Sequence, residues 1–422
     1  MRLLILGLNY APEMIGIGRY TADMAEGMAR RGHEVQVVTA QPYYPGWKVF
    51  QGYPRWRYSQ SDGGGLRILR CPLYVPARPS GARRLLHHAS FAAAALPALV
   101  GAILRRRPDL VLVIAPSLIS ALPGILMARL AGARTWLHVQ DLEVDAAFAT
   151  GLLPGNGWIA RLARGYEGWI LRRFDRVSTI SVPMLHRLQA KGVAPDRLRE
   201  LRNWADLATV TPQPRDQSLA QSLGVGTRYV ALYSGNIANK QGLELLADAA
   251  QRLGDCVDLT FLVCGDGPFL PRLKHLCQGL NVVFQPLQPK DRLGVLLSLA
   301  TVHLLPQSAG AADLVLPSKL TNMLASGRPV VATAAPGTAL ASEVSGCGLL
   351  AAPGDPEGFA QAIRDLVMDP ALCARLGKAA RARAEERWDG VRLLDSFEAD
   401  AEALLAQHAP EAGGRSWQGQ GH

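Results

Sequence analysis

The sequence predicts an α/β protein made of two doubly wound, Rossmann-like halves. Three observations predict it: short apolar runs recur along the chain, helix-length segments separate them, and a strand-turn-helix pattern typical of nucleotide-binding folds opens each half, at residues 2–8 and 229–234. Fully apolar strands are typical of a parallel sheet covered on both faces. A chain of 422 residues, 49% of them hydrophobic, can form two such cores.

The expected strands fall into two series along the chain. The first comprises residues 3–8, 35–39, 66–71, 110–115, 135–139 and 177–181, and the second comprises residues 229–233, 259–264, 282–284, 302–305 and 330–333. A polar stretch at residues 206–218, with Pro212 and Pro214, separates the series as a linker would. We therefore expect domains at residues 1–208 and 217–388, a last helix crossing back at 389–408 and a disordered tail at 409–422.

Charge and cysteine usage narrow the possible partners and the compartment. Lys and Arg number 45 against 35 Asp and Glu, so the surface should attract anions such as nucleic acid, anionic lipid or phosphorylated substrates. We discount nucleic acid because no basic helix carries interleaved aromatic residues. Six single cysteines without a CxxC pair fit a reducing cytosol, and no histidine or carboxylate spacing predicts a metal site. Residues 3–8 lack a cleavage site and fit a first strand better than a signal peptide.

The turn after the first strand holds Gly16 and Gly18 before a helix expected from Tyr20. Glycine lets a backbone approach a ligand closely, and a helix N-terminus offers free N–H groups to an anion. As a dinucleotide fingerprint the turn is incomplete, because Thr21 stands where a third glycine belongs. A tight turn without a ligand is the alternative.

Two loops of the second half have the same character. Gly235 and Asn236 end a strand, and Lys240 follows in the loop, where a lysine can neutralise a diphosphate leaving group. Gly265 and Gly267 form a sharp exit from the next strand with exposed amides. A solvated lysine and an ordinary turn are the alternatives.

A further phosphate-binding element is predicted at residues 316–327. Ser318 should cap a helix that runs to Ala325 and stops at Gly327. Lys319 and the first amides of this helix would then meet a phosphate. A lysine on the protein surface is the alternative.

Residues 89–104 form an apolar segment bounded by arginines at 83–84 and 105–107. The segment is shorter than the roughly 20 residues that a spanning helix needs, and Pro97 should interrupt it. Either a helix on the surface of an anionic inner leaflet or a core helix with ordinary surface arginines fits this pattern. A lipid-linked acceptor would explain a helix on the membrane surface.

Together these motifs resemble the retaining glycosyltransferases of family 4, which have the GT-B fold with two Rossmann-like domains facing each other across a cleft. The resemblance covers residues 1 to about 408, and residues 10–13 and 317–327 are most similar to colanic acid and exopolysaccharide enzymes. It implies transfer of a sugar, with retention, from a nucleoside diphosphate sugar such as a GDP-sugar to a lipid-linked acceptor. It also implies no cofactor and no metal.

The chain departs from the family where catalysis is most often assigned. Leu314 and Asn322 stand at the places of two glutamates, so Asp313 or Asn322 with backbone groups would have to replace them. Gln140 takes the place of a histidine before Asp141, and His138, on the same side of the strand, should point toward the cleft.

The candidate residues are therefore of two kinds. The catalytic candidates are Lys240, Lys319, His138 and Asp141. The candidates for donor binding are Gly16, Gly18, Gly235, Asn236, Gly265, Gly267, Ser318 and Asn322.

Two other functions stay open at this point. A non-catalytic, membrane-associated partner in polysaccharide assembly could have kept the fold and lost the carboxylates. A sugar-nucleotide epimerase of the same fold is disfavoured by the apolar basic segment and the Pro-Ser-Lys helix. For the transferase we expect a cytoplasmic location, peripheral at the inner membrane.

Overall fold

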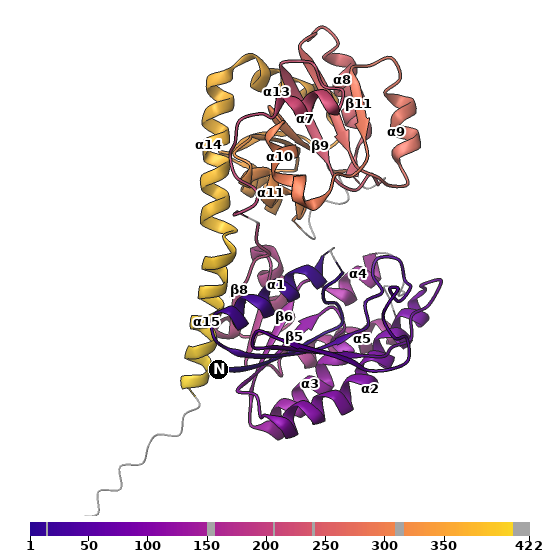
Figure 1. The fold of residues 1–422 in the computed structure, drawn as a ribbon, viewed down its shortest axis with the longest axis vertical. Coiled ribbons are helices and arrows are strands. Elements are labelled where there is room, and N and C mark those ends of the chain that lie inside the picture. Colours follow the sequence, from indigo (N-terminus) through magenta and orange to yellow (C-terminus); the bar gives the residue numbers. More distant parts are fainter. Residues whose placement is uncertain (14–15, 150–156, 206, 239–240, 309–315, 408–422) are drawn as a thin grey trace, which may run out of the picture. The chain divides into compact units, whose positions relative to one another are not determined.

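The computed structural model of the protein describes residues 1–13, 16–149, 157–205, 207–238, 241–308 and 316–407. The chain forms two compact units (Figure 1). Unit 1 comprises Met1–Leu201 together with the chain from Leu394 onward, and unit 2 comprises Arg202–Leu393. Each unit has its own sheet and its own buried core.

Unit 1 contains an eight-stranded sheet with the order β3-β4-β2-β1-β5-β6-β7-β8. Its strands are β1 (Arg2–Gly7), β2 (Glu34–Ala40), β3 (Ser59–Gly63), β4 (Leu66–Cys71), β5 (Leu110–Ala115), β6 (Arg134–Val139), β7 (Arg176–Thr179) and β8 (Leu198–Glu200). All neighbours pair in parallel except β3 and β4. The sequence prediction missed β3 because it is polar and β8 because it spans three residues.

The helices of unit 1 lie on both sides of this sheet. They are α1 (Ile17–Arg30), α2 (Gly81–Arg105), α3 (Leu118–Ala131), α4 (Glu143–Ala149), α5 (Trp158–Leu171), α6 (Val182–Ala190), the 3-10 turn η1 (Pro195–Arg197) and, from Leu394 onward, α15 (Gly390–Ala406). Right-handed crossovers place α2, α3 and α5 on the side opposite α1 (Figure 1). On the α1 side, α15 packs its Phe397 ring 4.9 Å from the Trp136 ring of β6.

Pro97 does not interrupt α2, contrary to the sequence prediction. The helix runs continuously for 25 residues through this proline. Pro97 lies on the exposed side of α2, where water can replace the hydrogen bond that a proline removes and where curved helices open toward solvent.

Unit 2 contains a six-stranded, fully parallel sheet with the order β11-β10-β9-β12-β13-β14. Its strands are β9 (Tyr229–Ser234), β10 (Leu259–Cys264), β11 (Val282–Gln285), β12 (Val302–Leu305), β13 (Val330–Thr333) and β14 (Gly348–Ala351). Its helices are α7 (Gln217–Ser222), α8 (Glu244–Arg252), α9 (Leu270–Leu276), η3 (Lys290–Arg292), α10 (Leu293–Ser298), α11 (Lys319–Ala325), α12 (Ala339–Val344), α13 (Pro356–Met368) and α14 (Pro370–Arg387). The sequence prediction missed β14, a four-residue strand that starts with a glycine.

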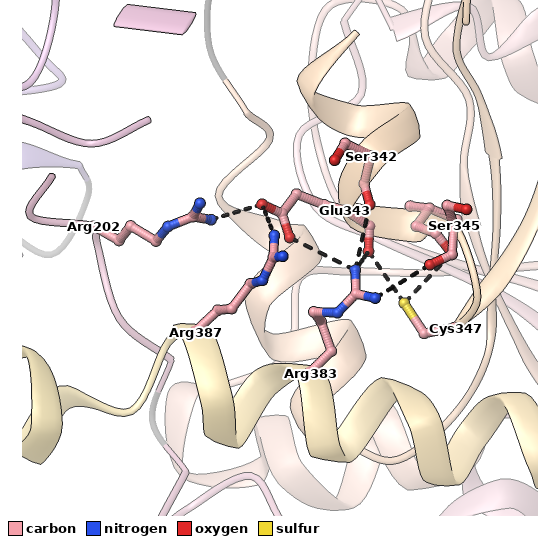
Figure 2. Close-up of polar contacts among 8 residues, drawn as sticks. Arg202, Ser342, Glu343, Ser345, Cys347, Arg383 and Arg387 are labelled. Atoms are coloured by element: carbon pink, nitrogen blue, oxygen red, sulfur yellow. Dashed lines mark hydrogen bonds and ion pairs between the residues drawn. The ribbon is translucent and has the colours of Figure 1, made fainter. Parts of the chain in front are cut away.

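A buried carboxylate ties three parts of unit 2 together (Figure 2). Glu343 of α12 is 5% exposed. Its Oε1 lies 2.7 Å from Arg202 and 2.8 Å from Arg387 of α14. Arg383, also of α14, donates to the Glu343 carbonyl oxygen at 3.0 Å. The network fastens α12 to α14 and to the first residue of the unit, and therefore holds the carboxyl-terminal part of the sheet in place.

Candidate functional site

The loops after β9 and β10 pack against each other at the carboxyl edge of the unit 2 sheet. The Gly235 amide donates to the Cys264 carbonyl oxygen at 2.9 Å. A Cβ atom on Gly265 would lie 2.0 Å from the Gly235 carbonyl oxygen, and one on Gly267 would lie 2.2 Å from the Ile237 carbonyl oxygen. Only glycine fits at Gly265 and Gly267, so backbone rather than side chains forms this surface.

Lys319, on the first turn of α11, lies beside this glycine-lined surface. Its Nζ donates to Tyr233 Oη at 3.0 Å and to Gln241 Oε1 at 3.1 Å, and it stands 4.1 Å from the centre of the Tyr233 ring. A Cβ atom on Gly235 would lie 3.6 Å from Lys319 Cδ. Lys319 is thus held by neutral groups at the end of β9.

The charge of Lys319 has no counter-ion among the residues that the structure describes. Burial lowers the pKa of this ammonium to about 7. A phosphate placed beside Lys319 would favour its charged form, because the negative charge replaces the hydration that burial removes from the ammonium. The arrangement therefore suits an anion, and backbone amides at the adjacent loops suit the same ligand.

Asn322 lies three residues after Lys319 on α11, so the two share a side of the helix. Its Oδ1 is buried and has no hydrogen-bond partner among the residues that the structure describes. Buried acceptors are nearly always paired, and an unpaired one calls for a donor from a ligand or water. A hydroxyl of a bound molecule, such as a ribose, would satisfy it.

Ser318 does not cap α11, which corrects the sequence prediction. It has helical backbone angles, φ −59° and ψ −22°, and its side chain makes no capping hydrogen bond. A capping side chain needs an extended backbone at its own residue in order to reach back to the helix amides. Ser318 is instead exposed, and its carbonyl oxygen accepts from Thr321 Oγ1 at 2.9 Å.

The structure brings together five of the donor-binding and catalytic candidates of unit 2, namely Gly235, Asn236, Gly265, Gly267 and Lys319. Lys240, Asp313 and Leu314 lie outside the described residues. Two contributors, Tyr233 and Gln241, were missed by the sequence analysis. The available signal was a tyrosine at the end of an apolar strand, directly before the Ser-Gly turn. The roles assigned to these residues remain predictions.

In unit 1, a buried glutamate organises the turn between β1 and α1. Glu13 accepts hydrogen bonds from Asn9 Nδ2 at 2.8 Å and from the amides of Tyr43 and Tyr44 at 2.7 and 2.9 Å. Burial raises the pKa of this carboxyl group. A Cβ atom on Gly18 would lie 3.1 Å from Glu13 Cβ. The close packing at Gly18 accounts for a glycine there without any ligand.

A glycine is needed at position 16 for a different reason. It precedes α1 with φ +65° and ψ −134°, a backbone conformation that side-chain-bearing residues rarely adopt. A Cβ atom there would meet no other atom within 4 Å. The glycine is therefore set by backbone conformation, and its part in donor binding stays a prediction.

His138 lies inside unit 1. Its Nδ1 is 2.9 Å from Ser178 Oγ, which also accepts from Trp136 Nε1 at 2.8 Å. The ring is 2% exposed, and burial lowers its pKa to about 4. His138 is therefore neutral at pH 7. Its side chain belongs to the core of unit 1, and not to the carboxyl edge of the sheet, where we expected it. Asp141, just beyond β6, is exposed. The catalytic roles of both remain predictions.

Glu143, the first residue of α4, places a partly buried carboxylate at the start of α3, a contact that the sequence analysis did not predict. Glu143 Oε2 accepts from the Leu118 amide at 2.9 Å, and Oε1 lies 3.6 Å from His88 Nδ1. Burial raises the pKa of Glu143 and lowers that of His88 to about 4. A carboxylate at a helix N-terminus is stabilised by the free amides. Glu143 thus fixes the turn that follows β5.

Over the described part of the chain, no three His, Cys, Asp or Glu side chains are grouped so as to hold a metal ion. The six cysteines are free thiols.

Comparison with known proteins gives concordant results. Residues 16–204 match the glycosyl transferase 4-like domain family, and residues 228–369 match the glycosyl transferases group 1 family. The chain is 41% identical to the colanic acid biosynthesis glycosyl transferase WcaI of Escherichia coli strain K12, over 94% of this chain and 98% of that protein.

Two solved structures share the fold. Sucrose-phosphate synthase from Thermosynechococcus elongatus superposes with a TM-score of 0.73 at 17% identity, covering 96% of this chain and 100% of that one. HepE from Anabaena, in complex with UDP, superposes with a TM-score of 0.68 at 17% identity and the same coverage.

Proposed function

This chain belongs to the family 4 glycosyltransferases with the GT-B fold, and we propose that it transfers a sugar from a nucleoside diphosphate sugar to a lipid-linked exopolysaccharide acceptor. The observation that carries the proposal is Lys319, a partly buried lysine whose ammonium is held by neutral groups among the described residues, beside loops that expose backbone. A diphosphate supplies the charge that this position lacks.

The proposed chemistry assigns one task to each feature of unit 2. Lys319 stabilises the negative charge that develops on the departing nucleoside diphosphate, and it does so with little reorganisation because Tyr233 and Gln241 already hold it. Asn322 accepts a hydrogen bond from the ribose. The acceptor hydroxyl attacks the anomeric carbon on the face that the leaving group departs from, so the configuration is retained. The proton of that hydroxyl passes to the leaving diphosphate.

We propose that the reaction needs neither a metal nor a cofactor. Lys319 offers positive charge to the diphosphate where a divalent cation would otherwise be needed. Because Asn322 stands at the place of a family glutamate, ribose binding here depends on an amide rather than on a carboxylate.

Two further observations support the proposed acceptor and location. The relative with 41% identity is named for colanic acid biosynthesis, which supports a polysaccharide acceptor. The exposed side of α2 is apolar and ends in Arg105–Arg107, which supports work at the surface of an anionic membrane. We therefore propose a cytoplasmic enzyme that is peripheral at the inner membrane. GDP-sugars and UDP-sugars are the donors to compare.

Nucleotide binding should be visible as a rise in melting temperature. GDP or UDP at about 100 times its dissociation constant stabilises the folded state by about 2.7 kcal/mol. We expect one of them to raise the melting temperature equally in EDTA and in magnesium. A shift that needs magnesium would contradict metal independence, and the absence of any shift would contradict the donor site.

One further function has an observation in its favour. The replacement of the family glutamate by Asn322 would suit a protein that binds nucleotide without turning it over, as a partner in polysaccharide assembly. That protein would show the melting shift but no transfer of sugar from any donor.

A further inference from the structure

The outer side of the layer formed by α2 and α3 exposes two apolar stripes. Each repeats every four residues and therefore follows one side of its helix. The stripes consist of Leu96, Val100 and Leu104 on α2 and of Leu122, Leu126 and Leu130 on α3. Leu104 is 81% exposed and Leu130 is 67% exposed. Soluble proteins rarely leave such contiguous apolar surface uncovered unless it binds something.

Helix α5 continues this surface with aromatic residues. Trp158 is 69% exposed, Leu162 is 64% exposed, and Trp169 is also exposed. Tyr166 of α5 donates from its hydroxyl to the Leu118 carbonyl oxygen at 3.0 Å, which joins α5 to the start of α3. We call the three stripes together, on α2, α3 and α5, the docking face. Tryptophan favours the interface between headgroups and hydrocarbon, so its presence here indicates a bilayer.

The charged residues of the docking-face helices are mostly arginines. Ten arginines lie on the three helices or directly after them: Arg83, Arg84, Arg105, Arg106, Arg107, Arg129, Arg161, Arg164, Arg172 and Arg173. The only acidic residue in the sequences of α2, α3 and α5 is Glu167, which is buried and lies 2.6 Å from Lys191. The face thus complements an anionic surface.

The acidic residues on the opposite side of the same sheet are largely paired with cations. Helix α15 carries Asp395, Glu398, Asp400 and Glu402 in its sequence. Arg31 lies 2.7 Å from Asp395 and 3.3 Å from Glu398, and Arg199 lies 3.0 Å from Asp400. An anionic surface would therefore attract the arginine-rich side of unit 1 more strongly than this side, which favours one orientation of the unit.

Helix α2 is suited to lie on a membrane rather than to cross it. Among the described helices it is the one long and apolar enough to span by length and composition. One side of it, however, is buried in the unit 1 core through Phe91, Ala95 and Leu99. Only the outer side is available, as in helices that rest in the headgroup region.

We propose that the docking face binds an anionic phospholipid bilayer and holds unit 1 at the membrane, an inference that rests on the proposed lipid-linked acceptor. The apolar stripes enter the outer hydrocarbon, the tryptophans lie at the headgroups, and the arginines contact lipid phosphates. The occupant is the bilayer itself, because apolar side chains and an excess of arginines over acidic residues are combined on one face.

Vesicle flotation tests this directly. The full chain should float with vesicles of phosphatidylglycerol and phosphatidylethanolamine, float poorly with phosphatidylcholine, and lose binding in high salt because screening weakens the arginine contacts. Leu126→Glu/Leu130→Glu should lower partitioning at least ten-fold, and Arg129→Glu/Arg161→Glu should lower it to a similar degree. The matched control is Val257→Glu/Met368→Glu, which changes two exposed apolar residues of unit 2 and should float like the wild type.

Melting temperatures close to that of the wild type will show that the variants are folded. The proposal is overturned if the wild type does not float with anionic vesicles, or if the docking-face variants float as well as the control. It is also overturned if the wild type is a dimer that does not float with vesicles, and Leu126→Glu/Leu130→Glu dissociates that dimer. The nucleotide-induced melting shift, measured without vesicles, separates the two proposals, since its loss contradicts the donor site and leaves the docking face untouched.

Discussion

Replacing Lys319 by methionine is expected to lower the turnover number for sugar transfer by about 10²- to 10³-fold, the usual effect of removing one partner of the transition-state charge. Methionine retains most of the volume of the side chain between Tyr233 and Gln241 but cannot carry charge. Initial rates with saturating donor and acceptor measure the effect. We expect a larger change in turnover number than in the Michaelis constant for the donor.

The matched control is Lys378→Met, which removes an exposed lysine from α14 of the same unit. It should leave the rate unchanged. A rate for Lys319→Met within about three-fold of the control would contradict the assigned role of Lys319.

The pH dependence of nucleotide binding provides a second readout of Lys319. Burial lowers its pKa from 10.5 to about 7 in the free protein, and a bound diphosphate raises it again. GDP or UDP affinity should therefore decline above about pH 7, by up to about ten-fold per pH unit. Lys319→Met should lack this decline. An identical decline in both proteins would show that another group titrates.

The same lowered pKa has a consequence for stability. The unfolded chain binds the proton more tightly than the fold does, so the charge destabilises the ligand-free protein at every pH below about 10.5 and most strongly below about 7. Lys319→Met should consequently melt at a higher temperature than the wild type. Lower activity together with higher stability would distinguish a binding-site lysine from a structural one.

Replacing Glu343 by alanine is expected to destabilise unit 2 by about 3–5 kcal/mol, because Arg202 and Arg387 lose the buried carboxylate that lies 2.7 and 2.8 Å from them. For a unit of this size the loss corresponds to a fall in melting temperature of roughly 10 °C. Chemical denaturation measures the change in the free energy of unfolding.

Glu385→Ala provides the comparison on the neighbouring helix. Glu385 is exposed and lies 2.6 Å from Arg381 one turn away, and such surface pairs contribute about 0.2–1 kcal/mol. Equal losses in the free energy of unfolding for Glu343→Ala and Glu385→Ala would show that burial does not make the ion pairs of Glu343 more stabilising.

The sequence predicted the parallel strands well because burial on both faces makes them continuously apolar, as in β5 and β10. It could not predict β3, whose polar residues pair only at the edge of the sheet. The same limit explains Ser318, since a capping serine and an exposed helical serine look alike until the backbone angles are known.

The candidate site was partly predictable for similar reasons. Gly265, Gly267 and Lys319 stand in short local patterns, so sequence alone singles them out. The contacts of Tyr233 and Gln241 with Lys319 join segments 78 to 86 residues apart, and only the fold brings these segments together. The stripe on α5 was overlooked because arginines lie between its apolar residues along the sequence. On the helix surface these arginines lie beside the stripe.

The proposed reaction is the transfer of a sugar from a nucleoside diphosphate sugar without a metal. The most direct measurement is the transfer of labelled sugar from GDP- and UDP-sugars to lipid-linked saccharides in EDTA, with the anomeric configuration of the product determined by NMR. The wild type should transfer the sugar with the donor configuration retained, and Lys319→Met should do so at a rate lower by about 10²- to 10³-fold. Nucleotide binding without transfer from any donor, or a product of inverted configuration, would contradict it.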